Sequence, residues 1–264
     1  MQCVNLNGAR MTYTESGDPT APTLLLLSGW CQDHRLFKTL APELARDFHV
    51  ICLNWRGHDD QQTLAGDFTS QDLADDLLSF IDAKQLDDVH LVSTSHGCWV
   101  NIEVCERLGT ERIPSTVVID WLMQPHPGFW QQLAQGQHPS DYAAGRQSFF
   151  DEWAAATDNA DVLNHLKVEM PWFDGEMWRR ACREIESNYR RWNSPLDRMS
   201  AIASKPRVRH IYSQPLSDDY RRMQLDFAAS NGWFDPCHIP GNTHFPSLEN
   251  PMAVARAIRE FYQN

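Results

Sequence analysis

The sequence predicts an α/β fold in which helices flank a mostly parallel sheet and a helical cap is inserted in the core. Three observations support this prediction. Short apolar runs alternate with amphipathic helical stretches along most of the 264 residues, which is typical of a parallel sheet covered on both faces. One apolar run breaks abruptly into a sharp turn and a helix near residue 95. A stretch near the middle of the chain interrupts the alternation and concentrates aromatic residues.

The composition excludes several classes of protein. Asp and Glu outnumber Lys and Arg by 35 to 23, and the formal net charge of −12 disfavours binding to nucleic acid or to an anionic membrane. The seven cysteines are scattered without a C-x-x-C pair, so we expect reduced thiols in a cytoplasmic protein. The chain shows no export signal and no apolar run of membrane-spanning length. Nothing in the sequence indicates the oligomeric state.

The first elements of the sheet come from the N-terminal part of the chain. Residues 2–15 alternate weakly around Asn7-Gly8 and are expected to form a hairpin at the sheet edge. Residues 23–27 and 49–53 are continuous apolar runs, as expected of strands buried on both faces. Leucines at helical spacing predict helices over residues 36–44 and 72–81.

The break near residue 95 is predicted to be a nucleophile elbow. An apolar strand ends at Val92, and a helical pattern follows through Leu108. An elbow holds its central residue at strained backbone angles, so the residues two before and two after it must be small. Ser93 and Gly97 meet this demand around Ser95. The alternative for Ser95 is a helix N-cap, since serine is a preferred cap residue.

The next strand brings a carboxylate to the same region. Residues 116–119 are an apolar run that delivers Asp120 at its carboxyl end. Open α/β sheets bind ligands in crevices at the carboxyl ends of their strands. We therefore expect Trp30, Ser95 and Asp120 to share one rim.

The alternation of strands and helices stops after residue 124 and resumes after residue 195, which defines the expected domains. We expect a core of residues 1–124 and 196–264, with a helical cap of residues 125–195 inserted in it. After the cap, strands are expected over residues 208–212 and 233–239, and helices over residues 219–229 and 251–262.

Three residues complete a catalytic pattern. Ser95, Asp120 and His244 follow the triad order of α/β hydrolases, which predicts the α/β-hydrolase fold. Asp120 at a strand end needs a partner to offset its desolvation, and His244 in a late loop is the natural one. A carboxylate on one imidazole nitrogen leaves the other able to take a proton. Asp218 and Asp219 are the alternative acids, although a position at the start of a helix suits them better. The alternative for His244 is a loop histidine bonded to its own backbone.

Backbone amides and tryptophans are expected to complete the site. The N–H groups of Trp30 and His96 stand where an α/β hydrolase places its oxyanion hole. Trp153 in the cap is a candidate for stacking on a flat ligand, whereas Trp99 and Trp121 are expected in the core.

We expect no metal and no nucleotide cofactor. His34, His58 and His126 have no zinc-ligand spacing beside them, and the chain contains neither G-x-G-x-x-G nor a P-loop. Taken from the residues alone, the default prediction is a capped serine hydrolase acting on an ester or C–C bond.

Five longer stretches are more specific than the fold. They are Leu-Ser-Gly-Trp-Cys-Gln-Asp-His-Arg (27–35), Asn-Trp-Arg-Gly-His (54–58), Ser-His-Gly-Cys-Trp-Val (95–100), Ile-Asp-Trp-Leu-Met (119–123) and Thr-His-Phe-Pro (243–246). Over nearly the whole chain, the sequence resembles the cofactor-independent 2,4-dioxygenases that open 3-hydroxy-4(1H)-quinolone rings.

The resemblance implies a small aromatic N-heterocyclic substrate, O2 as cosubstrate, no cofactor, and N-formylanthranilate or an N-acyl homologue plus carbon monoxide as products. It implies that His244, supported by Asp120, removes the 3-hydroxyl proton, and that the anion reacts with O2 directly. Ser95 then becomes a hydrogen-bond partner instead of an obligatory nucleophile. The positions that match the family's substrate site are Trp30, Cys31, Gln32, Thr94, Ser95 and Trp153. Besides a serine hydrolase, a non-catalytic receptor for an aromatic ligand is the alternative.

Overall fold

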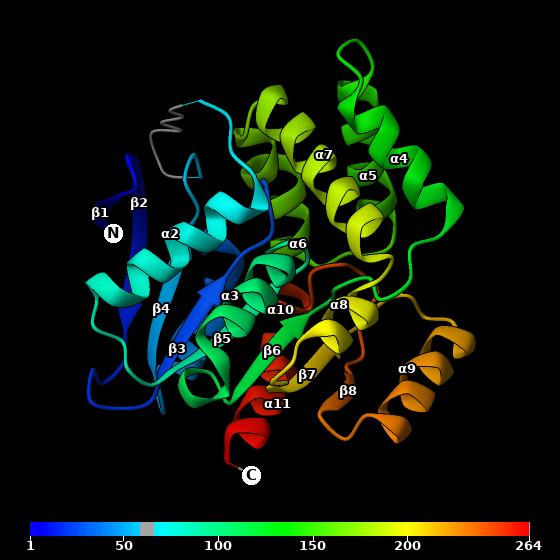
Figure 1. The fold of residues 1–264 in the computed structure, drawn as a ribbon. Coiled ribbons are helices and arrows are strands. Elements are labelled where there is room, and N and C mark those ends of the chain that lie inside the picture. Colours follow the sequence, from blue (N-terminus) through cyan, green and yellow to red (C-terminus); the bar gives the residue numbers. More distant parts are fainter. Residues whose placement is uncertain (59–65, 264) are drawn as a thin grey trace.

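The computed structural model describes residues 1–58 and 66–263 and contains one eight-stranded sheet with helices on both faces (Figure 1). The strand order is β1-β2-β4-β3-β5-β6-β7-β8. The pairs β1/β2 and β2/β4 are antiparallel, and every pair from β4 to β8 is parallel. The strands are β1 (Gln2–Leu6), β2 (Ala9–Ser16), β3 (Thr23–Leu27), β4 (His49–Asn54), β5 (Val89–Thr94), β6 (Ser115–Ile119), β7 (Arg207–Tyr212) and β8 (Phe234–His238).

The predicted strands are confirmed, and their burial explains why. The hairpin turns at Asn7 and Gly8, which both have positive φ angles, and β1 lies at the sheet edge. All residues of β3, β4 and β6 are buried, as continuous apolar runs predict for strands covered on both faces.

One helix expected from the sequence is divided into two short helices in the structure. Residues 36–44 were expected to be one helix, but η1 (His34–Phe37) and α1 (Leu40–Leu44) are separate. Pro42 has no N–H and cannot donate a hydrogen bond to the preceding turn, so a helix cannot continue through it. A new helix begins at Leu40 instead, because the first turn of a helix tolerates proline. The other core helices are α2 (Ser70–Ala83), α3 (Gly97–Arg112), α9 (Asp218–Ser230), α10 (Pro246–Glu249) and α11 (Pro251–Gln263).

Between β6 and β7, helices joined by short loops are the regular elements of the chain. Helices α4, α5 and α7 lie together beyond the ends of the parallel strands (Figure 1). Their aromatic side chains pack on one another, as where Phe149 and Phe150 contact Trp178 with ring centroids 5.9 and 5.6 Å away. The elements are α4 (Pro127–Gln137), α5 (Tyr142–Ala155), α6 (Ala160–Asn164), η2 (His165–Glu169), η3 (Met170–Trp172), α7 (Gly175–Trp192) and α8 (Pro195–Ala201).

Two general expectations can be checked on the described residues. All seven cysteines are free thiols. No described helix is both long enough and apolar enough to cross a membrane.

Candidate active site

The turn between β5 and α3 has the backbone of a nucleophile elbow. Ser95 has a φ of 52°, in the left-handed region, and its amide donates to the carbonyl of Ile119 over 2.9 Å. A Cβ atom on Gly97 would lie 2.3 Å from the carbonyl oxygen of Ser28, so this position tolerates only glycine. The residue preceding α3 is His96, so Ser95 does not cap the helix, and its hydroxyl contacts His244 instead.

Ser93, the small residue two positions before Ser95, also has a structural function. The hydroxyl of Ser93 accepts a hydrogen bond from Asn101 Nδ2 over 2.7 Å. Thr116 donates to the oxygen of the same Asn101 amide over 2.9 Å. All three side chains are buried, so this network ties β5 and β6 to α3 directly beneath the elbow.

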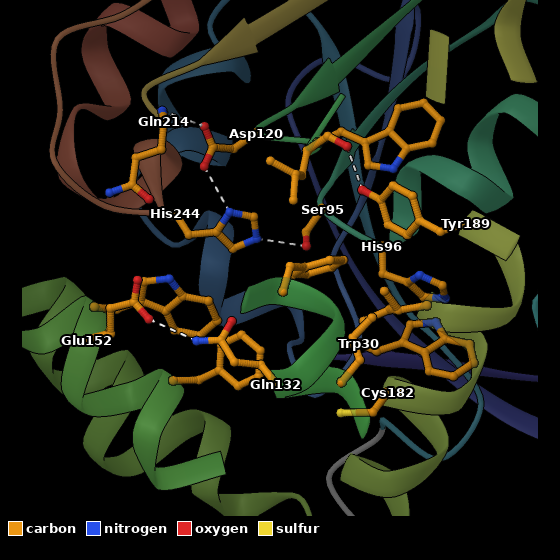
Figure 2. Close-up of a pocket in the computed structure, with 18 of the residues that line it drawn as sticks. Trp30, Ser95, His96, Asp120, Gln132, Glu152, Cys182, Tyr189, Gln214 and His244 are labelled. Atoms are coloured by element: carbon orange, nitrogen blue, oxygen red, sulfur yellow. Dashed lines mark hydrogen bonds and ion pairs between the residues drawn. The ribbon is translucent and has the colours of Figure 1, made fainter. Parts of the chain in front are cut away.

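Ser95, His244 and Asp120 form one hydrogen-bonded chain (Figure 2). His244 Nδ1 lies 2.9 Å from Asp120 Oδ2, and His244 Nε2 lies 2.8 Å from Ser95 Oγ. A carboxylate only accepts, so Nδ1 carries the proton of the neutral ring and Nε2 is free to accept one. The Nε2 atom is therefore arranged as a base that faces the cavity.

The backbone that follows the neighbouring strand β7 binds the carboxyl group of Asp120. It is 3% exposed, and its Oδ1 accepts from the amides of Ser213 and Gln214 over 2.8 and 3.3 Å. These bonds and the imidazole offset the cost of burying the charge. The alternative acids, Asp218 and Asp219, are exposed and lie in the first turn of α9. The helix dipole stabilises carboxylates at this position.

A cavity of about 410 Å³ opens in front of His244, between the ends of the strands and the helical segment. Its size suits a bicyclic ligand. At its edge, Gln132 donates to Glu152 over 3.0 Å (Figure 2). Apolar side chains make up most of its wall: Trp30, Trp99, Trp121, Leu122, Phe129, Leu133, Phe149, Trp153, Met170, Trp178, Ala181, Ile185, Pro215 and Leu216.

The structure brings most of the expected site residues to this cavity. The ones that line it are Trp30, Gln32, Ser95, His96, Asp120, Trp153 and His244. Cys31 and Thr94 are fully buried and are absent from its lining, so the expectation that they contact the substrate is not supported by the wall of this cavity.

The loop after β3 explains the positions of Gln32 and Cys31. The Gln32 side-chain oxygen accepts from the amide of Gly29 over 3.0 Å, so it stabilises its own loop. Cys31 has a φ of 59°, and its amide donates to His58 Nε2 over 3.0 Å. Burial raises the pKa of the Cys31 thiol far above its usual range, which keeps it protonated.

Two amides flank the elbow where the oxyanion hole was expected. Within the described part of the chain, neither the Trp30 amide nor the His96 amide donates a hydrogen bond to another group. The His96 ring packs edge-on against Trp30 with centroids 4.4 Å apart. Burial lowers the pKa of His96 to about 3, and the nearby His58 adds to the effect, so the ring is neutral.

The tryptophans behave differently from one another. Trp153 stacks on His244 with ring centroids 5.4 Å apart and an interplanar angle of 15°. Trp99 and Trp121 are buried and meet edge to face at 4.8 Å, which confirms their core position. They also form part of the cavity wall, which the sequence interpretation missed.

No group of three or more His, Cys, Asp or Glu side chains that could hold a metal ion occurs among residues 1–58 and 66–263. The histidines considered above have other contacts. His34 Nδ1 lies 3.3 Å from the side-chain oxygen of Asn54, and His126 accepts from the amide of Phe129 at the start of α4.

The sheet order, the elbow and the Ser95–His244–Asp120 chain define an α/β-hydrolase-fold protein. In agreement, the model of the alpha/beta hydrolase family matches residues 24–257. The chain is 74% identical, over the full length of both proteins, to 1H-3-hydroxy-4-oxoquinoline 2,4-dioxygenase from Pseudomonas putida. A solved structure of 1H-3-hydroxy-4-oxoquinoline 2,4-dioxygenase superposes with a TM-score of 0.98, at 74% identity and complete coverage of both chains. The chain is also 34% identical to 2-heptyl-3-hydroxy-4(1H)-quinolone dioxygenase from Mycobacteroides abscessus, over 95% of this chain and 93% of that one.

The protein therefore belongs to the 3-hydroxy-4-quinolone dioxygenases within the alpha/beta hydrolase family.

Proposed function

We propose that this protein is a ring-cleaving 2,4-dioxygenase that converts a 3-hydroxy-4(1H)-quinolone and O2 into an N-acylanthranilate and carbon monoxide. Two comparisons support the reaction: the relatives that match this chain over at least 93% of their own length are named as dioxygenases of hydroxyquinolines or hydroxyquinolones. The arrangement of His244 between Asp120 and the cavity supports the assignment of the base.

The first step is removal of the 3-hydroxyl proton by His244 Nε2. Asp120 stabilises the resulting imidazolium through Nδ1, at 2.9 Å. The substrate anion is electron-rich, and it supplies the electrons for reaction with O2. Oxygen joins C2 and then C4 to give a bridged peroxide, whose collapse breaks the C2–C3 and C3–C4 bonds and releases C3 as carbon monoxide. Both atoms of O2 remain in the carboxylate product and its acyl group, so the atoms balance.

The walls of the cavity suit this chemistry. A largely apolar lining with many aromatic rings excludes water from a reactive anion and strengthens its attraction to the imidazolium. Trp153 lies nearly parallel to the His244 ring and packs on its face, which limits the rotation of the imidazole. The Ser95 hydroxyl, 2.8 Å from Nε2, is a hydrogen-bond partner for the substrate oxygen.

We further propose that residues 125–195 act as a cap over a core of residues 1–124 and 196–264. Helices α4, α5 and α7 contribute much of the apolar cavity wall, including Phe129, Phe149 and Trp178. Their side chains then determine which substituent at C2 the cavity accepts.

Product analysis of a metal-free preparation tests this function. Incubation with 3-hydroxy-4(1H)-quinolone should consume O2 and release CO in equal amounts, and a series of 2-alkyl homologues should define the accepted chain length. Substrate turnover that continues unchanged without oxygen would show that the proposal is wrong.

A serine hydrolase is the second candidate, because Ser95 Oγ and His244 Nε2 lie 2.8 Å apart beside two available amides. Ser95→Ala separates the two functions. A hydrolase should lose several orders of magnitude in rate, whereas the dioxygenase should retain a substantial part of its CO release. Tight binding of an aromatic ligand with no product would instead indicate a receptor.

A further inference from the structure

The loop that carries His244 is held by Ser213, which follows β7 and is fully buried. The Ser213 amide donates to Asp120 Oδ1, as described above. The Ser213 hydroxyl lies 2.7 Å from the carbonyl oxygen of Thr243 and 3.4 Å from Asp120 Oδ1. A hydroxyl has one proton, and the shorter contact takes it. Ser213 therefore holds the carboxylate with its backbone and the histidine loop with its side chain.

Glu249, at the end of α10, holds the same loop from the other side. Its Oε2 accepts from the amides of Asn242 and Thr243 over 3.0 Å each, and from the Thr243 hydroxyl over 2.8 Å. The Thr243 hydroxyl in turn accepts from the amide of Phe245 over 3.2 Å. The backbone on both sides of His244 is thus tied to one carboxylate, and bonds to a charged acceptor are the stronger kind.

Gly241 shows how closely the loop passes between these two residues. A Cβ atom at this position would lie 2.9 Å from Glu249 Oε2 and 3.1 Å from Ser213 Cβ. The absence of a side chain at residue 241 is what lets the chain contact both residues.

We propose that Ser213 and Glu249 are positioning residues for His244, and that they keep Nε2 within proton-transfer distance of the substrate. The inference rests on the proposed function, because it assigns the two residues to the deprotonation step of that reaction. A general base must come within hydrogen-bond distance of its proton. Neither side chain is part of the cavity wall, so each acts through the loop.

The test compares Ser213→Ala, Glu249→Ala and Glu249→Gln with wild type. Under anaerobic conditions the bound 3-hydroxy-4(1H)-quinolone accumulates, and its absorbance gives the fraction present as the anion at each pH. For Ser213→Ala and Glu249→Ala, we expect kcat to fall by about 10- to 100-fold, as for a catalytic group displaced by less than about 1 Å. We also expect a higher midpoint pH for anion formation and little change in KM. Glu249→Gln keeps an oxygen that can accept the same bonds, so it should recover most of the activity.

Ser247→Ala is the matched control. Ser247 is a fully buried serine of α10, and its hydroxyl has no hydrogen-bond partner among the described residues. Its removal should leave kcat and the anion midpoint as in wild type.

An anion midpoint and kcat that stay at wild-type values in Ser213→Ala and Glu249→Ala would overturn the inference. So would a lower Tm with an unchanged midpoint, which indicates a purely structural role. If Ser213→Ala does not fold, the comparison of Glu249→Ala with Glu249→Gln decides alone. Failure of the wild-type protein to form the anion or release CO would instead count against the proposed function.

Discussion

Replacing Asp120 with asparagine removes one acceptor from a site that uses two. Asp120 Oδ2 accepts from His244 Nδ1, and Oδ1 accepts from the Ser213 amide. Asparagine has one oxygen, so its NH2 group must face one of these donors. If it faces His244, Nδ1 has to accept, and the ring proton moves to Nε2, where it blocks the base. If it faces Ser213 instead, a buried amide loses its partner, at a cost of about 1–3 kcal/mol.

The first orientation is therefore favoured, and its kinetic effect can be sized. General base catalysis contributes about 10²–10⁴-fold to a rate, and an asparagine that selects the wrong histidine tautomer in a serine protease costs about 10⁴-fold. We expect Asp120→Asn to lower kcat by about 10²–10⁴-fold, which corresponds to about 3–5 kcal/mol of barrier. KM should change much less, because asparagine has nearly the same shape as aspartate.

The assay is release of CO under aerobic conditions, together with the absorbance of the bound substrate without O2. Asp120→Asn should bind the neutral form of the substrate and fail to convert it to the anion at neutral pH. The control is the double variant Asp218→Asn/Asp219→Asn, whose exposed carboxylates lie at the start of α9 and should leave the rate unchanged. An Asp120→Asn rate close to wild type, or a large loss in the double variant, would move the acid away from Asp120.

Two further predictions concern stability. Gly97→Ala places a Cβ atom 2.3 Å from the Ser28 carbonyl oxygen, and overpacking of this kind lowers the free energy of unfolding by about 1–3 kcal/mol. Denaturant unfolding measures this loss. An unchanged unfolding midpoint would contradict the steric argument. Burial lowers the pKa of His96 to about 3 and that of His210 to about 4. The unfolded chain binds these protons near pH 6.5 and the folded chain does not, so the free energy of unfolding should fall as the pH drops below 6.5, by on the order of 2 kcal/mol per histidine at pH 5. A free energy of unfolding that is flat between pH 7 and pH 5 would refute the pKa assignment.

The strands could be predicted from the sequence because each is a local signal. The run Thr23–Leu27 has leucine at its last four positions and is a strand with the expected bounds. The elbow at Ser95 was equally readable, since its requirement for small neighbours concerns residues only two positions away. The break between η1 and α1 does not appear in the leucine spacing, because it depends on Pro42, which cannot donate a backbone hydrogen bond.

The support of the site could not be predicted in the same way. Ser213 and Glu249 are ordinary polar residues in the sequence, and their bonds to Asp120 and to the histidine loop depend on strands and helices meeting in space. The walls of the cavity were visible only as a concentration of aromatic residues between positions 125 and 195. Which of those rings face His244 depends on how α4, α5 and α7 pack.

A hydrolase-like triad and a dioxygenase reaction are compatible because of where the first proton comes from. His244 Nε2 can accept only one proton. The hydroxyl of Ser95, 2.8 Å away, and the 3-hydroxyl of the substrate are the two groups that can donate it. The 3-hydroxyl of a quinolone, whose anion is delocalised over the ring, is a stronger acid than a serine hydroxyl, so in the proposed reaction the substrate is the group that gives up its proton. Once His244 is an imidazolium it cannot deprotonate Ser95, which stays a neutral donor instead of a nucleophile.

The charged residues of the cavity are also compatible with transfer of the substrate proton to His244. Among the described residues that line it, none is Lys or Arg, and the acidic ones are Asp120 and Glu152. In the proposed reaction, the imidazolium of His244, beside Ser95, is the cation formed next to the substrate anion. Asp120 stabilises that imidazolium from behind, at 2.9 Å from Nδ1. The proposed proton transfer moves charge within the cavity without changing its net charge, and the apolar wall strengthens the resulting ion pair. On this reasoning, the acidity of the bound molecule decides whether the triad serves oxygenation or hydrolysis, so an ester without an acidic hydroxyl should leave Ser95 free to act as the nucleophile.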